Sequence, residues 1–146
     1  MKCYVVADTN IIVSAFISVM RKSKVEDSVP LKVLFLLLDR KNKIIPVFND
    51  DILNEYKEVM SRPEFRISKP IIGKFLNDIR SIGVSLEAAD IDEELPDSDD
   101  VVFYQVVMEG RKTENSFLVT GNKRHFPVKD FVVSPAEFLE RVAEFE

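Results

Sequence analysis

Short apolar runs alternate along the chain with longer segments whose apolar residues recur at helical spacing. The first run, 3–7, is rich in β-branched and aromatic residues, which is typical of a buried strand. It stops at the polar tripeptide 8–10, where we expect a turn and a helix cap. By the same pattern we predict further strands over 44–48, 84–86, 117–119 and 131–133.

Helices are predicted between these strands, each with an identifiable beginning or end. Residues 31–38 are apolar nearly all round and follow Ser28 and Pro30, so we expect a buried helix there. Asn49 is the predicted cap of a helix that runs to about Met60. Further helices are predicted over 68–82, over 99–108 with Gly110 ending it, and from Pro135 onward behind Ser134.

The alternation of strands and helices defines the expected fold. Strands that alternate with helices favour a mainly parallel sheet covered on both faces. We therefore predict a three-layer α/β/α sandwich. The sequence contains no repeat, linker or low-complexity tract, so we expect residues 1–146 to form a single domain.

Composition narrows the class of protein. With 46% apolar and 31% charged residues in 146, the chain is typical of a globular domain and not of a disordered one. Its one cysteine, Cys3, excludes a disulfide within the chain and fits a reducing compartment. The longest uncharged run, 9–20, has 12 residues, against about 20 needed to span a bilayer. We expect a cytoplasmic protein that does not enter the membrane.

The net charge of −5 conceals an uneven distribution. Residues 87–100 contain eight acids and no base, whereas residues 21–43 contain seven bases against three acids. The basic segment can meet a phosphate backbone while the acidic segment holds cations. Ordinary solvated faces explain either segment equally well.

Polar residues follow four of the predicted strands. In an open parallel sheet, functional side chains gather beyond the carboxyl ends of the strands. Asp8 directly follows the first strand, and Glu55 lies on the helix after the second. The helix after the third strand begins at Asp97, Asp99 and Asp100, and Asn122 directly follows the fourth strand.

The helical wheel separates Glu55 from its neighbour Glu58. The apolar residues of this helix form one stripe, which consists of Ile52, Leu53, Tyr56, Val59 and Met60. Glu55 lies roughly 40° from Val59, at the edge of that stripe, whereas Glu58 lies roughly 100° from Val59. An acid at that edge can reach a cleft. Taken alone, the feature fits an ordinary surface glutamate better.

The acids at 97–100 are too numerous for a helix cap. One carboxylate caps a helix, but here Asp97, Asp99 and Asp100 stand within four residues. If they converge with Asp8, the carboxylates repel one another, and a divalent cation relieves that repulsion. Oxygen ligands favour Mg²⁺ or Mn²⁺ over Zn²⁺.

Other catalytic schemes lack their residues. His125 is the single histidine, and the G-x-S-x-G elbow of serine hydrolases does not occur. We interpret His125 as a surface or phosphate-contacting residue. The sequence also lacks G-x-G-x-x-G and GKS or GKT, and its four glycines leave little room for a phosphate-binding loop. We expect no nucleotide cofactor.

Four segments together resemble PIN (PilT N-terminal) domains. Residues 5–14, with Asp8-Thr9-Asn10 between hydrophobic runs, resemble the opening of that family, and residues 51–65 resemble the segment around its helical glutamate. Residues 96–103 resemble its acidic helix entrance, and residues 118–127 its V-T-G-D/N turn. All four occur in order, so the resemblance extends over residues 3 to about 138.

The resemblance implies a ribonuclease that depends on Mg²⁺ or Mn²⁺ and acts on RNA. Many small members are toxins of toxin–antitoxin pairs, often dimeric, so an antitoxin protein and a second copy are the implied partners. By position, Asp8, Glu55 and Asp100 match the family's three acids. Asp97 or Asp99 can assist or replace Asp100. The departure is Asn122, where many members have a fourth aspartate; an amide oxygen can bind a metal but brings no charge.

These matches suggest a role for each residue in hydrolysis of a phosphodiester. Asp8 and Asp100 flank a divalent ion, with Asp97, Asp99 and Asn122 as further candidate ligands. Glu55 holds the metal or orients the attacking water. Thr9, Asn10 and Thr120 hold the turn and the carboxylates in place, although ordinary turn hydrogen bonds explain the threonines equally well. Lys123 and Arg124 are the candidate contacts to RNA phosphate.

Two other functions remain open. The first is an RNA- or protein-binding regulatory module with the same fold and weak or absent catalysis, and Asn122 favours it. The second is a phosphatase or receiver domain. A dehalogenase-like phosphatase needs an acid where Asn10 stands, and a receiver needs an acid pair where the chain has only Asp8.

Overall fold

The computed structural model describes residues 2–41 and 43–145, and within them five strands form one parallel sheet. The strands are β1 (Cys3–Ala7), β2 (Ile44–Phe48), β3 (Val84–Ser85), β4 (Asn115–Val119) and β5 (Val132–Val133), in the order β3-β2-β1-β4-β5. β1 is therefore central. It pairs with β2 from Cys3 opposite Ile44, and with β4 from Cys3 opposite Asn115.

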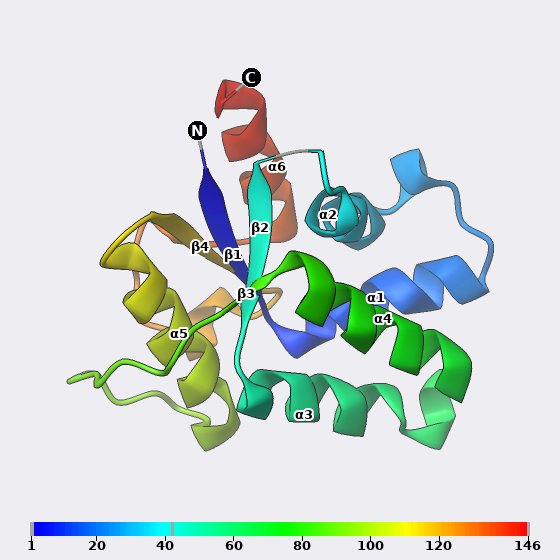
Figure 1. The fold of residues 1–146 in the computed structure, drawn as a ribbon, viewed down its shortest axis with the longest axis horizontal. Coiled ribbons are helices and arrows are strands. Elements are labelled where there is room, and N and C mark those ends of the chain that lie inside the picture. The colour runs from blue at the N-terminus through cyan, green and yellow to red at the C-terminus, as the bar shows by residue number, and fades with distance from the viewer. Residues whose placement is uncertain (1, 42, 146) are drawn as a thin grey trace.

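Helices cover both faces of the sheet, which confirms the predicted α/β/α fold. α5 lies on one side, α1, α2 and α6 lie on the other, and α3 runs past the carboxyl ends of β1 and β2 (Figure 1). The helices are α1 (Thr9–Met20), α2 (Val29–Leu38), α3 (Asp50–Met60), α4 (Lys69–Ile82), α5 (Val101–Arg111) and α6 (Pro135–Phe145). Short 3-10 turns are η1 (Val25–Asp27), η2 (Pro63–Phe65), η3 (Ser98–Asp100) and η4 (Lys123–His125).

The core lies on both faces of the central strands. All five residues of β1 are buried, as expected of a parallel strand covered from both sides. Phe103 and Tyr104 of α5 fill one face, and Ile12 of α1 and Phe138 of α6 are as fully buried. Burial also raises the pKa of the Cys3 thiol to about 12, so this cysteine is held in its unreactive protonated form.

The predicted helix caps are present. Ser28 Oγ accepts the Leu31 N–H at 3.3 Å and Asn49 Oδ1 accepts the Ile52 N–H at 2.9 Å. At α6 the bonds are reciprocal: Ser134 N–H donates to Glu137 Oε1 at 2.9 Å, and Glu137 N–H donates to Ser134 Oγ at 3.1 Å. This is a capping box.

One sequence expectation needs correction, and one helix was not predicted. Gly110 does not end α5, which continues to Arg111. A Cβ on Gly110 would lie 2.8 Å from Ser116 Oγ and 3.4 Å from the Tyr4 ring, so the glycine is required for close packing of α5 on the sheet. From the sequence we predict a helix cap at the tripeptide 8–10 but no bounds for α1, which Asp8 of that tripeptide caps.

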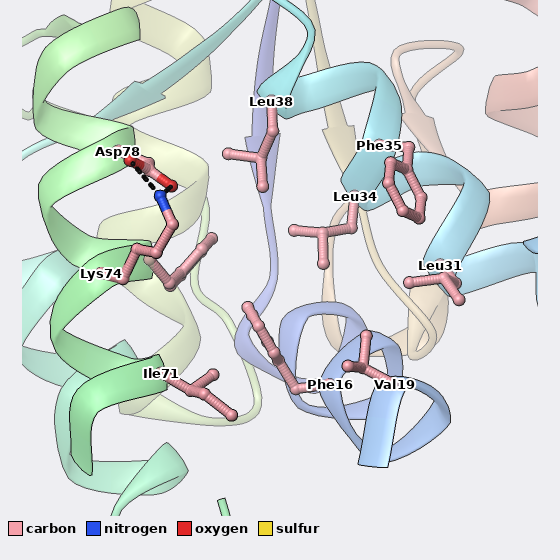
Figure 2. A pocket seen from close by; sticks show the side chains of 10 residues that line it. Phe16, Val19, Leu31, Leu34, Phe35, Leu38, Ile71, Lys74 and Asp78 are labelled. Atoms are coloured by element: carbon pink, nitrogen blue, oxygen red, sulfur yellow. Dashed lines mark hydrogen bonds and ion pairs between the residues drawn. The ribbon is translucent and has the colours of Figure 1, made fainter. Parts of the chain in front are cut away.

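An apolar hollow of about 200 Å³ opens between α1, α2 and α4. Phe16 and Val19 of α1, Leu34 and Phe35 of α2 and Ile71 of α4 line it (Figure 2). Phe35 is 55% exposed and Val19 is 41% exposed, so part of this apolar surface faces solvent. Among the described residues, none of the helices is both long and apolar enough to cross a membrane.

Candidate metal centre

The candidate site lies where the strand order of the sheet reverses. The connection after β1 leads toward β2, whereas β4 leads to β5 on the opposite side. The carboxyl ends of β1 and β4 therefore border the crevice in which parallel sheets bind ligands. Asp8 follows β1 directly and Thr120 follows β4, and the Asp8 N–H donates to Val119 O at 2.9 Å.

Asp8 is buried and both of its carboxylate oxygens are held. Its side chain is 6% exposed, Oδ1 accepts the Thr9 N–H at 2.8 Å as the cap of α1, and Oδ2 accepts the Thr120 hydroxyl at 2.7 Å. Burial raises the pKa of Asp8, while these two hydrogen bonds act in the opposite direction. The hydrogen bonds from Thr9 and Thr120 thus hold the buried Asp8 carboxylate in one orientation.

The acids at 97–100 have separate roles in the structure. Asp97 Oδ1 caps η3 by accepting the Asp99 N–H at 2.9 Å. Asp100 is half-buried, and its Oδ2 lies 3.1 Å from His125 Nδ1. Burial first, then the negative charges of Asp8 and Asp97, raise the pKa of Asp100. The charges of these acids therefore act on one another, as expected if they converge.

Glu55 faces the same cavity from α3. It is half-buried, whereas Glu58 is exposed and pairs with Arg62 at 3.1 Å. The position at the edge of the apolar stripe is thus the one that reaches the cleft. Burial, followed by the charge of Asp99, raises the pKa of Glu55.

One cavity of about 450 Å³ joins these side chains. Every acid predicted for the site borders it, together with Asn10 and Asn122. Asp97, Asp100 and His125 each offer a ligand atom, and these three atoms lie within 4.8 Å of one another. Two polar atoms buried at this cavity, Thr9 Oγ1 and Asn10 Oδ1, have no hydrogen-bond partner within residues 2–41 and 43–145. Carboxylate, amide and hydroxyl oxygens around a cavity suit a hard divalent cation.

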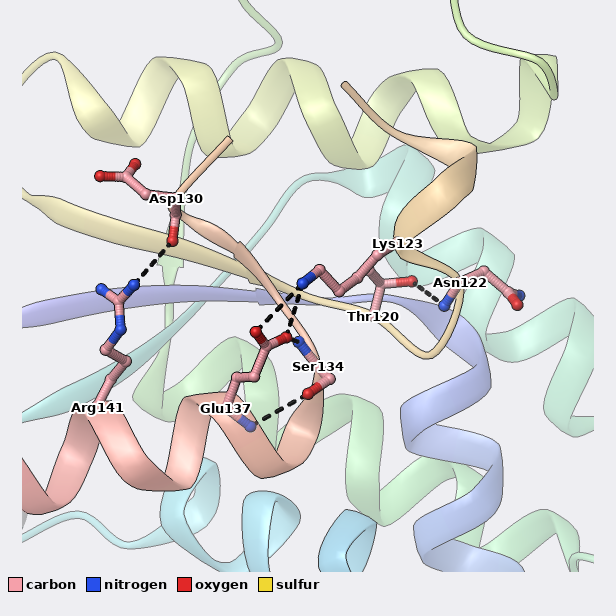
Figure 3. A network of polar contacts seen from close by, with 7 residues as sticks. All are labelled: Thr120, Asn122, Lys123, Asp130, Ser134, Glu137 and Arg141. Carbon is pink, nitrogen blue, oxygen red and sulfur yellow. Dashed lines mark hydrogen bonds and ion pairs between the residues drawn. The ribbon is translucent and has the colours of Figure 1, made fainter. Parts of the chain in front are cut away.

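The turn after β4 holds the remaining predicted residues. Thr120 Oγ1 donates to Asp8 and accepts the Asn122 N–H at 3.0 Å, so one hydroxyl connects both sides of the crevice. Lys123 Nζ lies 2.9 Å from Glu137 Oε1 on α6 (Figure 3). Lys123 and Arg124 lie beside the cavity and do not line it.

Two contributions were not foreseen from the sequence. His125 is interpreted there as a surface or phosphate-contacting residue, but it borders the cavity and contacts Asp100. The backbone N–H of His125 donates to Asn122 O at 2.9 Å, as in a 3-10 turn. The three-residue spacing between Asn122 and His125 was the signal in the sequence that could have placed His125 at the cavity. The Tyr56 hydroxyl donates to Ala7 O, which fixes the end of β1 beside Asp8; the sequence showed Tyr56 only as part of an apolar stripe.

The family model of the PIN domain matches residues 4–124. The match covers most of the 146 residues, and the chain therefore belongs to the PIN domain family. This confirms the resemblance found in the sequence and agrees with the parallel sheet between helices. No curated protein and no solved structure matches the chain significantly. PIN domains have a nuclease-like fold and are generally metal-dependent nucleases.

Proposed function

We propose that this protein is an endoribonuclease that needs Mg²⁺ or Mn²⁺ and hydrolyses phosphodiester bonds in RNA. The observation that carries the proposal is the convergence of acids from separate elements on one cavity at the reversal point of the sheet. Asp8 directly follows β1, Glu55 lies on α3 and Asp100 ends η3. Such a group of carboxylates, one of them buried, favours a bound cation.

Asp8 and Asp100 are the proposed principal ligands. Asp97, Asp99 and Asn122 supply further oxygens at the same cavity. A bound divalent ion lowers the pKa of water and stabilises charge on phosphoryl oxygens. Because Asn122 is neutral, the donor set carries one negative charge less than it would with an aspartate at position 122.

The other residues act on the water and on the RNA. Glu55, with its raised pKa, orients the attacking water and accepts a proton from it. Thr9, Asn10 and Thr120 hold the carboxylates and the turn, as the Thr120–Asp8 hydrogen bond supports. Lys123 and Arg124 would contact the phosphates that flank the cleaved bond, and Lys123 must leave Glu137 to do so.

The proposed ribonuclease acts as a cytoplasmic toxin of a toxin–antitoxin pair. Residues 1–146 act as one domain in this proposal. A protein partner, either an antitoxin or a second copy in a homodimer, is supported by the apolar hollow between α1, α2 and α4 (Figure 2). Exposed apolar patches of this kind mark interaction sites.

One observation favours a second candidate function. Asn122 stands where an aspartate would add negative charge to the metal site. A weaker site would leave a PIN-fold module that binds RNA or protein with little or no catalysis.

The two functions differ in a direct assay. The purified chain is incubated with a labelled pool of single-stranded RNA in Mg²⁺, in Mn²⁺ and in EDTA. An endoribonuclease gives internal cuts with either ion and none in EDTA. RNA retained on the protein without cleavage under any ion would favour the binding module and contradict the enzyme.

A further inference from the structure

We infer that His125 is a nitrogen ligand of the divalent cation and that it makes the site prefer Mn²⁺ to Mg²⁺. The inference rests on the proposed function, since it concerns the same cavity, but it adds a donor outside the oxygen set. His125 is the chain's single histidine.

The contact between His125 and Asp100 has the spacing of two ligands on one ion. His125 Nδ1 and Asp100 Oδ2 lie 3.1 Å apart. Two ligands at right angles around an ion, each about 2.1 Å from it, lie about 3.0 Å apart. Asp97 offers a third ligand atom within 4.8 Å of both. The three side chains therefore need only small shifts to share a cation.

Buried polar atoms at the same cavity point independently to a missing partner. Thr9 is 6% exposed, and its Oγ1 has no hydrogen-bond partner in the described part of the chain. Asn10 Oδ1 is buried without a partner in the same way. Both residues border the cavity that His125 and Asp100 line. A hydrated cation would supply the water that such atoms require.

Donor chemistry then decides which ion is favoured. Mg²⁺ demands oxygen ligands and keeps much of its water, whereas imidazole suits transition metals. Mn²⁺ accepts the same carboxylates and also tolerates a nitrogen donor. His125 would thus add affinity for Mn²⁺ that it does not add for Mg²⁺, in a site where Asn122 contributes no charge.

The test uses the untagged chain, so that no other histidine binds metal. Affinities for Mn²⁺ and Mg²⁺ are measured by calorimetry without RNA for the wild type, His125→Ala and Val128→Ala. Val128 follows closely after His125, is fully exposed and does not line the cavity, so its variant is the matched control. Pulsed electron paramagnetic resonance of the Mn²⁺-loaded chain, labelled with ¹⁵N-histidine, reports a directly bound nitrogen.

We expect a nitrogen coupling in the wild type and a fall of about tenfold or more in the ratio of Mn²⁺ to Mg²⁺ affinity for His125→Ala, with Val128→Ala retaining that ratio. Binding of both ions with no nitrogen coupling and an unchanged ratio would overturn the role of His125 while leaving the proposed ribonuclease intact. Failure of the folded wild type to bind either ion would overturn both.

Discussion

The Thr120 hydroxyl donates a 2.7 Å hydrogen bond to Asp8 Oδ2 across 112 residues of sequence. The bond is fully buried, since Thr120 is 0% exposed and Asp8 is 6% exposed. It joins the ends of β1 and β4, the two strands that border the crevice. The orientation of the central carboxylate thus depends on a residue contributed by a different strand.

Replacing this hydroxyl tests the dependence. Thr120→Val keeps the shape but leaves Asp8 Oδ2 without its donor, so we expect metal affinity to fall about 10- to 100-fold and the free energy of unfolding to fall by about 1–3 kcal/mol. Thr120→Ser retains the hydroxyl and is the control. Calorimetry with Mn²⁺ and denaturant unfolding measure the two effects; equal metal affinity in the Val and Ser variants would argue against this role.

Asn122 offers a gain-of-affinity test. Asn122→Asp adds a negative charge to the cavity that Asp8 and Asp100 line, and we predict tighter binding of divalent ions, because added carboxylate charge favours them. Without an ion the same variant should unfold more readily, since it adds repulsion. Weaker or unchanged affinity in calorimetry would mean that Asn122 does not face the ion.

The raised pKa values of Asp8, Glu55 and Asp100 predict how stability depends on pH. Their ordinary values are 3.8 for aspartate and 4.5 for glutamate. The folded state holds these protons more tightly than the unfolded state, so the ion-free protein loses stability as the pH rises above those values and through the raised ones.

A divalent ion reverses this trend because it binds the deprotonated carboxylates. The increase in melting temperature caused by Mn²⁺ should therefore be larger near pH 7 than near pH 5. Thermal unfolding with Mn²⁺ and with EDTA at both pH values measures it. A larger ion-induced increase at the lower pH would be inconsistent with carboxylate ligands.

The pKa of Glu137 is shifted in the opposite direction, downward. Hydrogen bonds from Ser134 and the contact with Lys123 lower its pKa to about 2, from 4.5 (Figure 3). Its contribution to stability is present above about pH 4.5 and is lost as the pH falls toward 2. Glu137→Gln should flatten the dependence of unfolding free energy on pH over this window.

The control for Glu137 is Glu140→Gln, which alters an exposed acid on the same helix. We expect it to retain the dependence of the wild type. Ser134→Ala, which removes the other half of the capping box, should cost about 1 kcal/mol. Identical pH curves for Glu137→Gln and Glu140→Gln, obtained by denaturant titration, would show that the capping box contributes nothing through charge.

The central strands β1 and β2 were predictable because each is a continuous apolar run, as a sheet covered on both faces requires. Residues 3–7 and 44–48 have the predicted bounds. α1 was not bounded from the sequence, because no glycine or proline closely follows Met20 and no cation lies in its last turn to mark its end. Gly110 was misinterpreted because close packing against Ser116 leaves no local signal in the sequence.

The sequence predicted which acids form the candidate site but not which side chains contact one another there. The rule that functional residues follow parallel strands selected Asp8 and Asn122, and the wheel position selected Glu55. The contact of His125 with Asp100 and the pairing of Lys123 with Glu137 depend on how η4 lies against η3 and α6. Contacts of that kind join segments far apart in sequence, so spacing along the chain does not encode them.

If Asp8 holds the ion required for RNA cleavage, Asp8→Asn should abolish that cleavage without unfolding the protein. Asparagine keeps the volume and the helix cap but removes the buried charge, so the fold should be at least as stable without metal. Cleavage of labelled RNA in Mn²⁺ is compared with the wild type and with Glu58→Gln, an exposed control on α3. We predict that Asp8→Asn loses metal-dependent cleavage while Glu58→Gln retains it. Full cleavage by a folded Asp8→Asn protein would show that Asp8 does not hold the ion required for cleavage.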